Sequence, residues 1–203
     1  FAKAQVGLDS SMAGILNSLT PLFTLIVSVL FYKLKTNLLN VLGVIIGLVG
    51  AVGLLYCNNK GLEYNFYFGS FVIVSTIMYA FNFNFVKIYL SDIDNEVIVG
   101  LAFTLIAVPS LIILFTSGFV TTMNTNPKAW EAFFSVSYLG ILSSALELLF
   151  YYKLIKITNV IFAASVTYLM PIVAIMWGVY FKEDFKPIFI LWIGLIMAGV
   201  YLS

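Results

Sequence analysis

The chain has 203 residues, of which 62% are hydrophobic and 9% are charged, and its mean hydropathy is +1.07. These values lie far outside the range of soluble proteins and predict an integral membrane protein built from helices. All ten basic residues are lysines, histidine is absent and the net charge is +1, which excludes a basic surface for nucleic acid and any histidine-based site. Cys57 is the single cysteine, so no intrachain disulfide is possible.

The first apolar run, residues 11–31, follows a short polar segment that begins at Phe1. It is long enough to cross a bilayer as a helix. Pro21 lies near its middle and removes the hydrogen bond to the carbonyl of Asn17, so that oxygen needs another partner. Broken helix backbone is tolerated at this depth only where protein or a water-lined cavity satisfies it.

A second run, residues 160–181, repeats this design with Pro171 in the middle and the carbonyl of Thr167 released. The two prolines are 150 residues apart, and polar Asn17 corresponds to polar Thr167 at the same offset. Each run is followed by a lysine-containing turn and an apolar helix rich in glycine. We interpret the pattern as an internal duplication, with identities at Ala13 and Ala163, Leu19 and Leu169, and Phe31 and Phe181.

Five further apolar runs bring the expected number of membrane spans to seven: 38–56, 66–90, 97–115, 132–152 and 187–202. A loop is expected at 116–130. Gly43 and Gly47 have the GxxxG spacing that lets two helices approach closely. Packing within one bundle is favoured over a dimer interface.

Three polar side chains interrupt these spans. Asn82 and Asn84 either face a substrate or have a structural role, by bonding another helix or by lying within reach of the membrane interface. Both alternatives stay open for Asn82, whereas the structural role is favoured for Asn84. Glu147 is the one ionisable group clearly inside a span, where Ser143, Ser144, Glu147 and Tyr151 share a face at helical spacing. It either binds a cationic group or a proton, or extends towards Lys153 near the helix end.

The duplication implies more helices than the seven that are visible. Three spans precede the second proline-bearing helix, but none precedes the first, so we expect an N-terminally truncated chain from a ten-helix protein. Residues 1–60 would be the last part of the first five-helix repeat, and residues 61–203 the whole second repeat. Because five is odd, the second repeat would be inverted in the membrane.

The chain resembles the EamA family of the drug/metabolite transporter superfamily. The resemblance rests on SSMAGILNSLTPLFTLIVSVLF and GVIIGLVGAVGLL in the first half, on YAFNFNFVKIYL, and on YYKLIKITNVIFAASVTYLMPIVAIMWGVYFKEDF with AGVYL in the second. It implies ten helices in two inverted repeats, a central cavity, cytoplasmic termini and export or exchange of small metabolites such as amino acids. Glu147 stands where the family usually has a small residue.

We therefore expect a multi-pass transporter of the cell membrane, inner or plasma, that works by alternating access on a small molecule. No catalytic residue, metal or cofactor is expected, and proton coupling is left open. The expected loops place equal numbers of lysines on the two sides of the membrane, so lysine counts do not give the orientation of the chain in the membrane. Alternatives are a non-transporting scaffold or regulatory subunit and, least favoured, an intramembrane enzyme using Asp92, Asp94 and Glu96. The expected substrate-binding residues are Asn17, Thr20, Pro21, Asn82, Glu147, Thr167, Tyr168 and Pro171.

Overall fold

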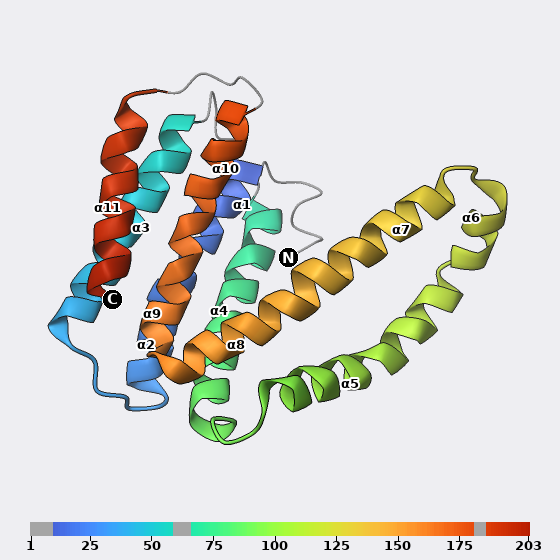
Figure 1. Ribbon diagram of the computed structural model, residues 1–203, viewed down its shortest axis with the longest axis horizontal. Coiled ribbons are helices and arrows are strands. Elements are labelled where there is room, and N and C mark those ends of the chain that lie inside the picture. Colours follow the sequence, from blue (N-terminus) through green and yellow to red (C-terminus); the bar gives the residue numbers. More distant parts are fainter. Residues whose placement is uncertain (1–9, 59–65, 181–185) are drawn as a thin grey trace. The chain divides into compact units, whose positions relative to one another are not determined.

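The computed structural model describes residues 10–58, 66–180 and 186–203, and their regular structure is helical (Figure 1). The all-helical fold class is confirmed. Among the described residues, five helices are long and apolar enough to cross a membrane: Ala13–Leu30, Leu38–Cys57, Tyr67–Tyr89, Asn95–Thr116 and Ala129–Ile157. The other two expected spans correspond to shorter apolar helices, Val160–Val173 and Ile188–Leu202, so the count of seven spans stays a prediction. The predicted boundary between residues 60 and 61 lies outside the described residues.

Contacts divide the chain into two compact units. The first contains the described residues up to Ile88 together with Thr158–Ser203. Its elements are α1 (Ser10–Asn17), α2 (Thr20–Leu30), α3 (Leu38–Asn58), nearly all of α4 (Phe66–Tyr89), α9 (Val160–Ser165), the 3-10 helix η3 (Val166–Leu169), α10 (Met170–Tyr180) and α11 (Ile188–Leu202). This unit holds both proline-bearing helices.

The second unit, Tyr89–Ile157, is a helical hairpin. Its first arm is α5 (Asn95–Thr116), and its second arm combines α7 (Ala129–Leu139), a π-helical segment η2 (Gly140–Ala145) and α8 (Leu146–Ile157). The expectation of a loop over 116–130 is wrong in part, because the short helix α6 (Phe119–Thr125) forms there. Gly118, at φ +77°, provides the left-handed turn before α6 that favours glycine.

Helices α3 and α11 lie side by side and form the most extensive contact of the first unit (Figure 1). Glycines make the contact possible. A Cβ atom at Gly43 would lie 2.7 Å from the backbone oxygen of Gly199, and one at Gly199 would collide with the backbone of Gly47. Small residues let membrane helices gain van der Waals contact where lipid offers no hydrophobic driving force. The glycine spacing therefore serves packing within this chain, as predicted.

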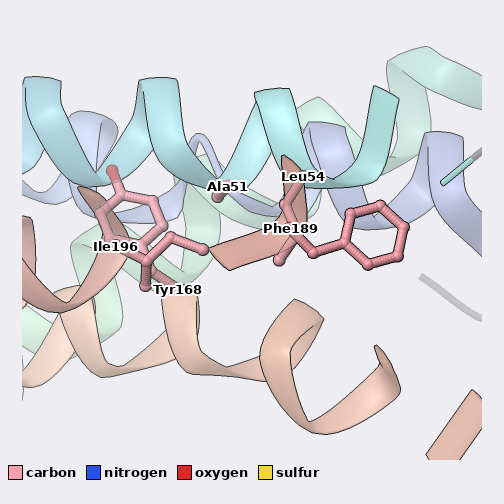
Figure 2. Close-up of a cluster of buried hydrophobic side chains, with 5 residues drawn as sticks. All are labelled: Ala51, Leu54, Tyr168, Phe189 and Ile196. Carbon is pink, nitrogen blue, oxygen red and sulfur yellow. The ribbon is translucent and has the colours of Figure 1, made fainter. Parts of the chain in front are cut away.

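A buried cluster fills the space beside this pair (Figure 2). Ala51 and Leu54 come from α3, Phe189 and Ile196 from α11, and Tyr168 from η3. All five side chains are at most 1% exposed. The cluster thereby joins the middle of the second broken helix to the α3–α11 pair.

Replacing Gly199 by alanine should lower the melting temperature of the protein in detergent, because the added methyl group forces α3 and α11 apart. Overpacking of this kind costs about 1–3 kcal/mol. Gly194→Ala in the same helix is the matched control, since a Cβ atom there meets nothing within 4 Å. Equal melting temperatures for the two variants would contradict glycine-dependent packing.

Candidate functional site at the two broken helices

The first proline-bearing span is broken where the sequence predicts it. Helix α1 ends at Asn17 and α2 begins at Thr20, with Pro21 as its second residue. Proline suits this position because the first turn of a helix has no partner for its N–H groups. Pro21 and Thr20 are both buried.

The carbonyl that Pro21 releases finds its partner inside the chain. The hydroxyl of Thr20 donates to the backbone oxygen of Asn17 at 2.7 Å and lies 3.4 Å from Oδ1 of the same residue. Thr20 thus replaces the backbone donor that proline lacks. Sequence analysis placed Thr20 in a binding site without predicting this structural task.

The second span is broken one turn before its own proline. Helix α9 ends at Ser165, the 3-10 turn η3 follows, and α10 begins at Met170 with Pro171 as its buried second residue. The released carbonyl of Thr167 accepts the backbone N–H of Met170. The hydroxyl of Thr167 donates to the carbonyl of Ala164 at 2.8 Å. The released carbonyl is therefore paired with a backbone N–H group in this break, and with a side-chain hydroxyl group in the first.

The two breaks meet. The side-chain amide of Asn17, the last residue of α1, donates to the thioether of Met170, the first residue of α10, at 4.0 Å. Sulfur is a weak acceptor, so this contact is weaker than an ordinary amide hydrogen bond. Asn17 is half-buried and Met170 is 59% exposed. The structure thus brings together Asn17, Thr20, Pro21, Thr167 and Pro171 at or next to the breaks, and adds Met170, which sequence analysis missed.

Tyr168 belongs to η3 but is committed to packing. Its ring fills the notch at Gly47, where a Cβ atom would lie 2.6 Å from a ring carbon. Its hydroxyl donates to the carbonyl of Val44 at 3.1 Å. In this conformation Tyr168 therefore fastens the second break to α3.

Helix α2 carries a ladder of buried hydroxyl groups on one face, formed by Thr20, Thr24 and Ser28. Each hydroxyl donates to the backbone carbonyl three or four residues earlier in the same span, namely that of Asn17, Thr20 or Thr24. Ser28 also lies 2.6 Å from Oδ1 of Asn84, whose amide donates to the carbonyls of Thr24 and Ala80. The predicted helix-to-helix role of Asn84 is confirmed. The spacing of four residues between Thr20, Thr24 and Ser28 was the signal that could have revealed the ladder.

The remaining predicted residues lie elsewhere. Asn82 is on an exposed face of α4. Glu147 belongs to the second unit, where it is exposed in the first turn of α8. The π-helical segment before it includes Ser143 and Ser144, so the regular helical stripe assumed from the sequence is interrupted. Its role stays a prediction.

The described part of the chain was also considered for metal-binding groups of side chains. No group of three His, Cys, Asp or Glu residues in that part could hold a metal ion. Asp92 and Asp94 lie before α5 and Glu96 lies in its first turn, and all three are exposed.

Apolar helices that could span a membrane, together with two helices broken at prolines, define a multi-pass membrane protein. The model of the EamA-like transporter family matches residues 1–56 and 69–203, and the chain belongs to this family. It is a family of transporters of the drug/metabolite type and not of enzymes. No curated protein matches the chain.

Exchanging Asn84 for leucine should reduce thermal stability, because its polar contacts with Thr24 and Ser28 of α2 are lost. Hydrogen bonds between membrane helices contribute about 0.6 kcal/mol on average and at most about 1.7. Combining Asn84→Leu with Ser28→Ala should cost little more than Asn84→Leu alone, since both act in one contact. Asn82→Leu on the exposed face is the control. If Asn82→Leu proved as harmful, or if the two losses simply added, Asn84 would not hold α2 to α4.

Proposed function

We propose that this protein is a secondary active transporter that exports or exchanges small metabolites such as amino acids by alternating access. The observation that carries the proposal is the meeting of the two broken helices at Asn17 and Met170. Secondary transporters commonly bind their substrates at midplane between discontinuous helices of two repeats. The chain shows no nucleotide-binding loop, so the energy would come from an ion gradient or from the exchanged substrate.

We place residues 1–60 at the end of a first repeat and residues 61–203 in a second, inverted repeat of a ten-helix protein. The helix boundaries support this division. Helices α2 and α10 begin at Thr20 and Met170, and α3 and α11 begin at Leu38 and Ile188, so both pairs have the 150-residue offset of the prolines. The family model also matches two separate stretches.

The proposed binding groups surround the two breaks. Asn17, Thr20 and Thr167 would offer hydrogen bonds, and Pro21 and Pro171 would provide the bends. Tyr168 would contribute its hydroxyl only after leaving the carbonyl of Val44. Asn82 would add another hydrogen bond, and Glu147 would bind an amine or a proton. We place the transporter in the inner or plasma membrane of the cell.

A screen for ligand-induced thermal stabilisation tests the proposal. The full-length protein would be incubated separately with amino acids, polyamines, nucleosides and sugars. A ligand that binds only the folded form raises its stability by mass action, by about 2.7 kcal/mol at one hundred times the dissociation constant. We expect one class to raise the melting temperature in proportion to its concentration. The absence of stabilisation in every class would favour the scaffold interpretation.

The Glu147→Gln variant should abolish uptake into proteoliposomes or remove its dependence on pH, because the amide neither carries a proton nor pairs with a cation. The loss of uptake should be tenfold or more, equivalent to about 1.4 kcal/mol. Glu131→Gln is the control, since Glu131 is also an exposed glutamate of the second unit. Unchanged uptake across the pH range would remove Glu147 from the mechanism.

Alanine in place of Pro21 or Pro171 should slow transport more than it reduces the yield of folded protein, because the restored backbone donor straightens the helix. Initial uptake rates divided by the amount of monodisperse protein measure the effect. Pro109→Ala is the control, since Pro109 lies inside the continuous helix α5. A parallel loss of yield and of transport would show that the prolines serve folding alone.

A further inference from the structure

The tip of the helical hairpin carries four aromatic side chains in contact with one another. Figure 1 shows α6 at this tip, between α5 and α7. The ring centroid of Phe133 lies 5.9 Å from that of Phe119 on α6, 6.1 Å from that of Trp130 and 5.9 Å from that of Phe134. Trp130 and Phe134 also contact each other, at 6.1 Å. We call these four residues the tip cluster; it joins α6 to the start of α7.

The tip cluster combines apolar surface with a neighbouring charge. The side chains of Trp130 and Phe134 are 57% and 65% exposed, and large rings of this kind are stabilised when they leave water. Lys128, directly before α7, is also exposed, and its charge would be costly inside hydrocarbon. The interface between water and hydrocarbon accommodates both, and tryptophan is enriched there in membrane proteins.

The length of the second arm places the same residues at the interface. Its helical run Ala129–Ile157 has 29 residues, about 44 Å at 1.5 Å per residue, whereas the hydrocarbon core is about 30 Å thick. Lys128 and Lys153 are both exposed and lie 25 residues apart, about 38 Å along the arm. Lysine side chains reach the interface from slightly inside it. The two lysines therefore mark the two membrane surfaces, with Trp130 close to one of them.

The arm is hollowed directly after the tip cluster. An open hollow of about 620 Å³ is lined by Phe134, Ser135, Ser137, Tyr138 and Ile141. The hydroxyl of Ser135 already donates to the backbone carbonyl of Glu131 at 2.9 Å, so the wall is mainly aromatic and aliphatic carbon. Ile141 is 11 residues beyond Trp130, about 16 Å deeper along the helix. The hollow therefore lies at the depth of the lipid acyl chains.

We propose that the tip cluster and this hollow form a docking surface for a phospholipid of the bilayer. The phosphate would lie at the level of Lys128, and an acyl chain would lie in the hollow. The argument for this occupant is the order of the groups along the arm. A cation, then interfacial rings and then an apolar hollow match the phosphate, the glycerol level and the chain of a phospholipid. The proposal does not depend on the proposed transport function.

Quenching by brominated lipids tests which molecule covers the hollow. In a Cys57→Ser background of the full-length protein, a fluorophore is attached to Ala132→Cys at the tip or to Ile141→Cys in the hollow. The vesicles contain phosphatidylcholine brominated near the glycerol end or near the methyl end of its chains. The label at residue 132 should be quenched more by the first lipid, and the label at residue 141 more by the second.

The control label is Leu105→Cys, because Leu105 is 74% exposed in the middle of α5 and reports ordinary contact with lipid. Quenching at residue 141 should be at least as strong as at residue 105. Clearly weaker quenching there would show that a helix or a second copy of the chain fills the hollow. The same depth profile at residues 132 and 141 would also overturn the proposal.

Removing two rings of the tip cluster tests its part in docking. With Trp130→Ala and Phe134→Ala combined, the depth of the label at residue 141 should change by about 3 Å or more, the rise of two helical residues. Phe103→Ala is the matched control, since Phe103 is an exposed phenylalanine of α5 outside the cluster. Phe134→Ala alone replaces the double variant if that variant is not monodisperse. An unchanged depth would overturn docking at the tip cluster.

Discussion

The structure depends on one constraint, which is that a helix broken inside a bilayer must still pair its backbone groups. Pro21 and Pro171 each release a carbonyl at mid-span. The chain pairs the oxygen of Asn17 with the hydroxyl of Thr20, and the oxygen of Thr167 with the N–H of Met170. Both released oxygens are thus paired within the chain. A 3-10 turn inside a helix often marks a hinge, so the proposed transporter would bend at the second break.

Packed helices support the two breaks. Glycines bring α3 and α11 into backbone contact, and Tyr168 fastens the second break to α3. Lysine side chains add to this support by pairing with carbonyls near helix ends: Lys87 contacts Thr158, and Lys186 contacts Cys57 at 2.8 Å. Cations near the C-terminal end of a helix are also favoured by the helix dipole. These two lysines therefore stabilise helix ends. Because lysines can be placed by such contacts, their number on each side says little about the orientation of the chain in the membrane.

Local chemistry made part of this structure predictable. Proline fixes the position of a break, GxxxG spacing predicts a close helix contact, and Asn84 at membrane depth needs a partner. The partners themselves depend on tertiary contacts. The sequence did not reveal that Thr20 would cap Asn17, that Met170 would meet Asn17, or that Tyr168 would fill the notch at Gly47. The π-helical segment before Glu147 was missed because a π turn interrupts the regular period of an α-helix. The helix α6 was missed because its residues have the composition of a loop.

The central proposal is that this protein moves small molecules across a membrane. Counterflow in proteoliposomes tests that claim most directly: vesicles are loaded with an unlabelled metabolite, and entry of a labelled trace of the same compound is followed. We expect transient accumulation of label above equilibrium for one class of metabolite, in vesicles that contain the protein and not in empty ones. Label that enters both kinds of vesicle at the same rate, for every class tried, would contradict the account.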